Sequence, residues 1–380
     1  MFRVLVPILL SFFLLSCNSR NKKESDSFQK KGDTLEIKYA QGFSVVDYKS
    51  FKILKVRNPW PGADKTFTYL LYRKGAQIPP NIEYDQKVEI PVKKIVLTST
   101  TQIPSLEALE KENTLVGFPG LNYISSKKTR KRIEEGKVHE LGKNEDINTE
   151  VLIAQHPDVV IGFAVNGNNK SLQLVQKTGI PVVFDGDWVE ESPLGKAEWI
   201  KFFGAFYNKS AEAEHIFNEI AQSYHQAKEL AKLAPNSPSV LSGSVFKDQW
   251  FVPYGNSWQA QFIKDANANY IFKNTHGHGS RSLAFETVLN TGQKADFWIA
   301  PGQFKSYSQL LQASPHYKEF KAVQNHKVFT YSNTTGKTGG VLYYELAPSR
   351  PDLVLKDLIH IFHPDILPDY NPVFFTPLKK

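Results

Sequence analysis

The chain has 380 residues, of which 41% are hydrophobic, 13% aromatic and 22% charged. This aromatic content excludes disorder along the whole chain, and the length is sufficient for two lobes, each with its own core. The formal charge of +8 comes from lysines scattered among carboxylates, so we expect no nucleic-acid partner.

The first 17 residues have the pattern of an export signal. Arg3 precedes the apolar run Val4–Leu15, which is shorter than the roughly 20 residues that a membrane-spanning helix needs. The run ends in Leu14-Leu15-Ser16-Cys17, which resembles the bacterial lipobox, where the cysteine is lipidated and begins the mature chain. We therefore expect residues 1–16 to be a lipoprotein signal peptide and Cys17 to be the lipidation site. Cys17 is the single cysteine, so no intramolecular disulfide is possible; an ordinary signal peptide with an incidental cysteine is the alternative.

A polar segment and a β-rich segment follow. Residues 17–33 are charged and nearly free of aromatic residues, which predicts a flexible tether. Residues 34–90 contain the alternating stretches LEIKY, FSVVDY and FKILKV, which are typical of half-buried antiparallel strands. We expect a small β-rich appendage here.

Residues 91–192 predict an N-terminal α/β lobe. Short, almost continuous apolar runs alternate with helix-like stretches, as in a parallel sheet covered on both faces. The expected strands are 94–99, 114–118, 158–163 and 180–185, with helices at 103–111 and 148–155.

Residues 193–236 predict connecting helices. The stretch Ser210–Leu233 carries an apolar stripe at helical spacing. A helix of this length extends about 36 Å, which suits a crossing between lobes, although packing on one lobe alone is the alternative.

Residues 237–380 predict a C-terminal α/β lobe. The expected strands are 239–245, 249–253, 295–300 and 327–331, and the strongest helices are Trp258–Ala266 and Tyr343–His363.

Catalytic motifs are missing from the sequence. There is no G-x-S-x-G elbow, no phosphate-binding G-x-x-x-x-G-K-[ST] loop and no H-E-x-x-H pair. Asp185 and Asp187 flank a glycine, and two acids on one loop are more often turn and cap residues than a catalytic pair. We therefore expect no enzymatic activity and no cofactor.

The segment His276-Gly277-His278 offers two imidazoles to a metal ion. A third ligand is not apparent nearby, so we assign no metal site. The two histidines lie on a loop that either faces a ligand or is simply exposed.

Aromatic and arginine side chains are the stronger signal for a binding site. Ligands bind at the carboxyl ends of strands in open α/β sheets, and aromatic rings offer rigid contact area to a bulky ligand. Arginines can neutralise an anionic ligand. The candidate ligand-binding residues are Tyr123, Trp188, Trp250, Tyr254, Trp258, His276, His278, Arg281 and Arg350.

The order of these segments resembles the helical-backbone class of periplasmic binding proteins, which serve ATP-driven importers of iron–siderophore complexes, haem and cobalamin. The resemblance covers roughly 93–377, about three quarters of the chain. It is carried by KIVLTSTTQIPSLEAL, INTEVLIAQHPDVVIGF, TGIPVVFDGDWVEESPLGKAEWIKFFGAFYNKSAEAEHIF, VPYGNSWQAQFIKDANANYIF and VLKDLIHIFHPDILPDY.

The resemblance implies an α/β fold of two Rossmann-like lobes, joined by a long helix, with the ligand in the cleft between them. It implies a monomer that docks on a membrane permease and its ATPase through one surface glutamate on each lobe. Glu286 occupies the second-lobe position. No glutamate lies near Asn169, where the first-lobe counterpart is expected, and Glu107 or Glu110 is the substitute.

The resulting hypothesis is a substrate-binding lipoprotein of the cell envelope, anchored by its N-terminal lipid on the periplasmic side or outer surface. It captures an iron–siderophore complex or cobalamin and delivers it to the permease. Haem, held axially by Tyr254, His276 or His278, is the alternative ligand. An α/β hydrolase-like enzyme and a surface adhesion lipoprotein using residues 34–90 are the alternatives from other functional classes.

Overall fold

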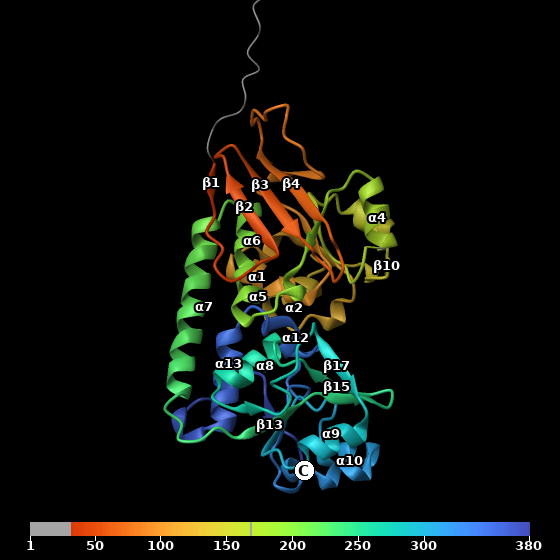
Figure 1. Cartoon of the computed structure of the whole chain (residues 1–380). Coiled ribbons are helices and arrows are strands. Elements are labelled where there is room, and N and C mark those ends of the chain that lie inside the picture. The colour runs from red at the N-terminus through yellow and green to blue at the C-terminus, as the bar shows by residue number, and fades with distance from the viewer. Residues whose placement is uncertain (1–31, 168) are drawn as a thin grey trace, which may run out of the picture. The chain divides into compact units, whose positions relative to one another are not determined.

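A computed structural model describes residues 32–167 and 169–380 (Figure 1). The predicted signal peptide, the lipidation site Cys17 and most of the predicted tether therefore lie outside the described residues. Within the described part, no helix is both long and apolar enough to cross a membrane.

The N-terminal appendage is a five-stranded sheet in sequential order. Every strand pair is antiparallel except the last, which is parallel. The loop before the second strand corrects one prediction: LEIKY is not a strand, because the backbone N–H groups of Lys38 and Tyr39 bind the Glu198 carboxylate instead of a neighbouring strand. The strands are β1 (Asp33–Thr34), β2 (Phe43–Asp47), β3 (Phe51–Arg57), β4 (Thr66–Arg73) and β5 (Gln86–Ile90).

The first lobe contains a five-stranded parallel sheet in the order β12-β11-β6-β7-β8. Its central strands are buried on both faces: Ile95 and Leu97 join one apolar cluster and Val96 joins another. This explains why the strands read as continuous apolar runs. The elements are β6 (Ile95–Leu97), β7 (Leu115–Phe118), β8 (His139–Glu140), β11 (Val159–Phe163), β12 (Val182–Asp185), α1 (Ile103–Ala108), α2 (Lys127–Glu134), α3 (Thr149–Ala154) and α4 (Lys170–Lys177). A short hairpin, β9 (Gly142–Lys143) and β10 (Asp146–Ile147), lies beside it.

Three helices lead from the first lobe to the second: α5 (Pro193–Glu198), α6 (Ile200–Phe206) and α7 (Ser210–Ala231). With 22 residues, α7 is about 33 Å long. It packs against α6 of the first lobe and α13 of the second (Figure 1). The apolar stripe predicted for this helix therefore contacts both lobes.

The second lobe contains a sheet in the order β16-β13-β18-β19-β20, parallel except at β20, and a separate antiparallel sheet in the order β14-β15-β17. The strands are β13 (Ser239–Ser242), β14 (Ser244–Phe246), β15 (Gln249–Pro253), β16 (Asn269–Tyr270), β17 (Ser280–Leu283), β18 (Phe297–Ile299), β19 (Val328–Thr330) and β20 (Thr376–Pro377). The helices are α8 (Trp258–Asp265), α9 (Phe285–Gly292), α10 (Tyr307–Ala313), α11 (Lys321–Gln324), α12 (Leu342–Leu346) and α13 (Pro351–Phe362).

The helix predicted over Tyr343–His363 is two helices. Pro348 follows the end of α12, and Pro351 is the first residue of α13. Proline cannot donate the backbone hydrogen bond that a helix interior needs but fits a helix's first turn. The pair of prolines therefore ends one helix and begins the next.

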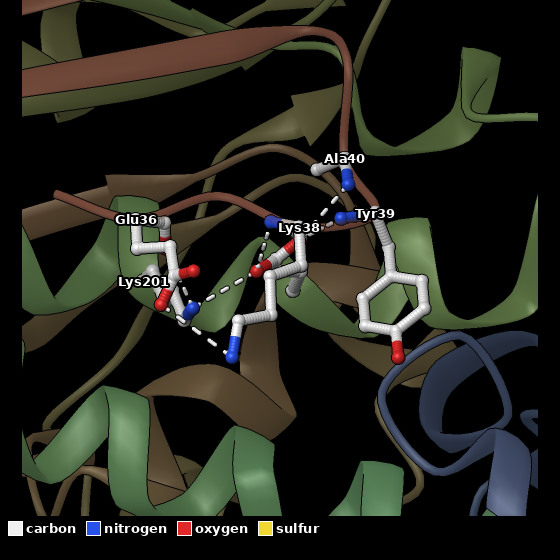
Figure 2. Close-up of polar contacts among 6 residues, drawn as sticks. Glu36, Lys38, Tyr39, Ala40 and Lys201 are labelled. Carbon is white, nitrogen blue, oxygen red and sulfur yellow. Dashed lines mark hydrogen bonds and ion pairs between the residues drawn. The ribbon is translucent and has the colours of Figure 1, made fainter. Parts of the chain in front are cut away.

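A buried carboxylate joins the appendage to the helices of the first lobe. Glu198 accepts hydrogen bonds from the backbone N–H groups of Lys38, Tyr39 and Ala40 at 2.9, 2.6 and 2.9 Å (Figure 2). Its other partner is the Lys201 ammonium, 2.9 Å away, and both side chains are almost fully excluded from solvent. A buried carboxylate is tolerable only when its oxygens are paired in this way.

A second buried carboxylate, eight residues earlier in the chain, makes the same kind of contact. Glu190 accepts from the N–H groups of Gln41 and Gly42 and from the Trp199 indole. The whole 38–42 loop is therefore held by side chains that lie about 150–160 residues later in the chain.

Replacing Glu198 by alanine should destabilise the folded protein strongly. The change leaves the Lys201 ammonium buried without its carboxylate and three backbone donors without an acceptor. We expect the free energy of unfolding to fall by about 3–5 kcal/mol in urea titrations. The control is Glu229→Ala, which removes an exposed ion pair with Lys232 and should cost no more than about 0.5 kcal/mol. A loss below about 1 kcal/mol for Glu198→Ala would show that the buried pair is not the anchor.

Candidate functional site

A buried polar cluster lies at the carboxyl ends of two strands of the first lobe. Asp185 ends β12, and its carboxylate accepts from the Gln102 amide at 3.0 Å and from the Asp187 backbone N–H at 2.9 Å. The bond from the Asp187 N–H, two residues along the chain, closes the kind of turn that an aspartate side chain typically forms. The expectation that Asp185 is a turn residue is thus confirmed.

Lys196 on α5 completes this cluster. Its ammonium donates to the backbone carbonyls of Asp187 and Trp188 at 3.0 and 2.9 Å. Burial lowers the pKa of Lys196, and the neighbouring carboxylates oppose this change. Burial also raises the pKa of Asp185 well above its usual range, and the Asp187 charge adds to the effect. The pKa of Asp187 is also raised by burial, and Lys196 opposes that rise.

The same lysine reaches the second lobe. Its Nζ lies 5.3 Å from the centre of the Trp258 ring, at the beginning of α8, a distance at which a cation–π attraction operates. Nearby in sequence, Glu191 of the first lobe forms a 2.7 Å contact with His278 Nδ1 of the second. The half-buried Trp258 and the exposed His278 are therefore the two candidate residues that the structure brings against the first lobe here.

Other candidates lie beside these contacts. Trp188 is half-buried, donates its indole N–H to the Pro59 carbonyl at 3.1 Å and packs edge-on against Phe163. Tyr254 follows β15, and its ring packs on Gly277, where a Cβ would lie 2.5 Å from the ring. His276 is exposed on the same loop.

Tyr123 occupies a different contact between the lobes. It ends the turn after β7 and is 71% exposed. Its backbone carbonyl lies so close to Gly340 that no side chain fits at that position. Ser125 strengthens this contact by donating its hydroxyl to the Gly340 carbonyl at 2.9 Å.

The structure removes two residues from the candidate set. Trp250 is fully buried in the second lobe, with ring centres of Trp298 and Phe320 at 5.1 and 5.5 Å, because alternate residues of β15 face the core. Arg350 forms a bidentate ion pair with Asp352, and both nitrogen–oxygen distances are 2.9 Å. It lies beside α7 and not at the carboxyl ends of the strands.

The remaining charged candidates differ in exposure. Arg281 on β17 and Glu286 in the first turn of α9 are exposed. Glu107 accepts hydrogen bonds from the hydroxyls of Ser126 and Thr129, so its carboxylate is partly occupied within the first lobe.

Metal ligation finds no support in residues 32–167 and 169–380. No group of three or more His, Cys, Asp or Glu side chains there is arranged to hold a metal ion. His276 and His278 therefore lack a third protein ligand within the described chain.

Two cavities lie away from the aromatic candidates Trp188, Tyr254 and Trp258. One, of about 340 Å³, is bounded by α1, α7 and the α12–α13 turn and contains Arg350. The other, of about 390 Å³, lies between the appendage and the first lobe.

Sequence reasoning did not assign a role to Gln102 or Lys196. Gln102 is one turn beyond the end of β6 and fully buried, and Lys196 sits in a helix whose six residues are all buried. The sequence feature that could have pointed to Lys196 is a lysine in the mostly apolar first turn of a helix, shortly after an Asp-Gly-Asp turn.

An acidic side chain also ties the lobes together. Glu345 on α12 accepts from the backbone N–H groups of Ser125 and Ser126 at 2.6 and 2.8 Å, at the N-terminus of α2. Burial raises the pKa of Glu345 to about 7, and the Glu107 charge adds to the rise.

Comparison with known proteins identifies related chains. Residues 95–335 match the model of a family described as periplasmic binding protein. An uncharacterized lipoprotein of Methanocaldococcus jannaschii is 28% identical over 385 aligned residues, covering 95% of this chain and 90% of that protein.

Solved structures share the fold. A periplasmic haem-binding protein from Pseudomonas aeruginosa matches with a TM-score of 0.58 and 17% identity, covering 76% of this chain and 99% of that one. A possible iron-binding, periplasmic solute-binding protein from Staphylococcus epidermidis matches with a TM-score of 0.56 and 17% identity, over 72% and 99% of the two chains. At these identities the likeness concerns the fold alone.

Glu345 should make stability depend on pH. Its folded-state pKa of about 7 lies above the ordinary 4.5, so the folded chain holds this proton more tightly than the unfolded chain. Stability from this group is complete below about pH 4.5 and is lost as the pH rises through about 7. Each pKa unit corresponds to about 1.4 kcal/mol, which gives a loss of about 3 kcal/mol.

Urea titrations at pH 5 and pH 8 test this expectation. The stability of Glu345→Gln relative to the unmodified protein should be higher at pH 8 than at pH 5 by up to about 3 kcal/mol, because glutamine does not ionise. Glu286→Gln, at an exposed position, is the control and should show no such difference. A stability difference for Glu345→Gln that stays constant with pH would contradict the assignment.

Proposed function

The chain belongs to the periplasmic binding protein family, and from this premise we propose that it is the substrate-binding lipoprotein of an ATP-driven importer. In this proposal it captures an iron–siderophore complex or cobalamin between its lobes and delivers it to a membrane permease. The observation that carries the proposal is the contact of Lys196 in the first lobe with Trp258 in the second.

The chemistry around this contact suits a bulky ligand with a flat face. Trp188 and Trp258 are half-buried aromatics near the carboxyl ends of strands, where α/β folds bind ligands. A planar ligand that binds between Trp258 and Lys196 would stack on the Trp258 ring with one face and contact the Lys196 ammonium with the other. We propose Tyr123, Trp188, Tyr254, Trp258, His276, His278 and Arg281 as the ligand contacts.

Binding without turnover is part of the proposal. The carboxylates of Asp185 and Asp187 are buried and held in a turn, which supports a structural rather than a catalytic role. The family and the related structures are described as binding proteins.

Attachment to the envelope follows from the N-terminal segment. A lipid on Cys17 would hold the protein at a membrane, and the related M. jannaschii protein is described as a lipoprotein. A single copy of the chain, docked on the permease and its ATPase, is sufficient for this role.

Haem is the second candidate ligand. His276 and His278 are exposed on the loop that packs on Tyr254, so an imidazole is available as an axial ligand without disturbing the fold. A haem complex would give an absorption spectrum that changes in His276→Ala or His278→Ala.

Tryptophan fluorescence tests the proposed site. Titration with ferric siderophores, cobalamin and haem should give saturable quenching at one ligand per protein for one of these classes. Trp258→Leu should weaken the affinity by about 10–100-fold, as expected for a central aromatic contact. Trp60→Phe, in the appendage, is the matched control and should bind with unchanged affinity. The absence of binding for every class would reject the proposal.

Docking on the permease can be separated from ligand binding. Glu286 is exposed in the first turn of α9 and is not one of the proposed ligand contacts, so Glu286→Arg should leave the ligand affinity unchanged. Uptake in cells should fall at least about tenfold, since a charge pair at an interface is replaced by a repulsion. Glu319→Arg, at another exposed position of the second lobe, is the control. Normal uptake by Glu286→Arg would exclude Glu286 as a docking residue.

A further inference from the structure

The cavity between the appendage and the first lobe has the composition of a binding site. Its volume of about 390 Å³ falls in the range of small-molecule sites. Its walls come from the appendage, through Trp60 and Phe67, and from the lobe, through α4 and Phe184 on β12. None of the proposed contacts between the lobes lines it.

One wall is aromatic. The ring centre of Trp60 lies 5.7 Å from that of Phe67 and 5.1 Å from that of Phe184. Phe184 is buried, whereas Trp60 and Phe67 are only half-buried. Part of each of these two rings is therefore free to contact a ligand that enters the cavity, and a rigid ring surface binds the apolar face of a small molecule well.

The facing wall is rich in side-chain amides. Gln86 on β5 and Gln176 on α4 are half-buried and line the cavity. Their side-chain amides make no hydrogen bond to any described residue. Gln173, on the same helix, donates to the Gly167 carbonyl at 3.3 Å. Each amide offers donors and an acceptor together, which matches a hydroxyl group, since a hydroxyl both donates and accepts.

The charges that line the cavity cancel. Lys65 Nζ lies 3.5 Å from Asp85 Oδ1 and 4.3 Å from the centre of the Phe67 ring. The other carboxylate oxygen of Asp85 accepts from the Thr68 backbone N–H at 2.7 Å. The lining therefore has no net charge to attract a phosphate, a carboxylate or a metal chelate.

We propose that this cavity is a second binding site, which takes a neutral saccharide unit. The apolar face of the sugar ring lies on Trp60 and Phe67, and its hydroxyls pair with the amides of Gln86 and Gln176. The sugar is either free in solution or the end of a glycan. The site is separate from the proposed importer ligand and does not depend on it.

Saturation-transfer NMR on the purified full chain tests this site, with methyl glucoside, methyl N-acetylglucosaminide and cellobiose as probes. We expect saturable transfer from the protein to at least one probe. The double variant Gln86→Ala/Gln176→Ala should weaken that binding at least about tenfold, equivalent to about 1.4 kcal/mol. Gln312→Ala, an exposed glutamine on α10, should bind as the unmodified protein does.

The thermal unfolding of the double variant is measured beside its binding. If that variant unfolds, Gln176→Ala alone and the shift of the Trp60 indole N–H resonance on addition of sugar provide the same test. Binding of free disaccharide identifies a soluble sugar as the ligand, and additional co-sedimentation with insoluble cellulose or chitin identifies a glycan end; both support the proposal.

Three results would overturn it. The first is no saturable transfer to any probe at about 10 mM, well above a millimolar dissociation constant. The second is equal binding by the double variant and the unmodified protein. The third is tighter binding of the nucleosides uridine or adenosine than of every saccharide, which would show that the aromatic wall selects a base instead.

Discussion

Buried charge in one short stretch of chain is the constraint on which the rest of the structure depends. Between residues 185 and 201 six ionisable side chains are buried: Asp185, Asp187, Glu190, Lys196, Glu198 and Lys201. A buried charge is costly unless it is paired and hydrogen-bonded, so each of these groups fixes the position of its partners. The carboxylates Glu190 and Glu198 hold the appendage loop, whereas Lys196 holds the turn after β12 and faces Trp258 of the second lobe.

This arrangement explains how one lobe contacts both the appendage and the second lobe. The helix α5 carries Glu198 toward the appendage and Lys196 toward the second lobe. Any movement of that helix therefore disturbs both contacts together. The long helix α7 and the Glu345 contact with α2 join the lobes at two further places. We infer that the lobes are held in a narrow range of positions.

The sequence predicts the α/β lobes well because parallel strands buried on both faces produce continuous apolar runs that local pattern alone can identify. It predicts the LEIKY loop incorrectly, since Lys38 and Tyr39 in that loop bind the Glu198 carboxylate, about 160 residues away. At the candidate site, the sequence of β15 does not separate Trp250 from Phe251, because both belong to one apolar run, and only the folded strand places Trp250 in the core and Phe251 outside it. The pairing of Lys196 with Trp258 depends on how the two lobes pack, and no local pattern in either segment encodes that distance.

Native mass spectrometry of the protein purified from its own host tests the proposed ligand delivery most directly, because it requires no prior choice of ligand. If the protein delivers such a ligand, one additional mass per chain is expected, matching a metal chelate or a corrinoid, and it is lost when the protein is denatured. Equal polypeptide masses under native and denaturing conditions, with no mass regained on addition of siderophores, cobalamin or haem, would contradict the claim that this chain delivers such a ligand to an importer.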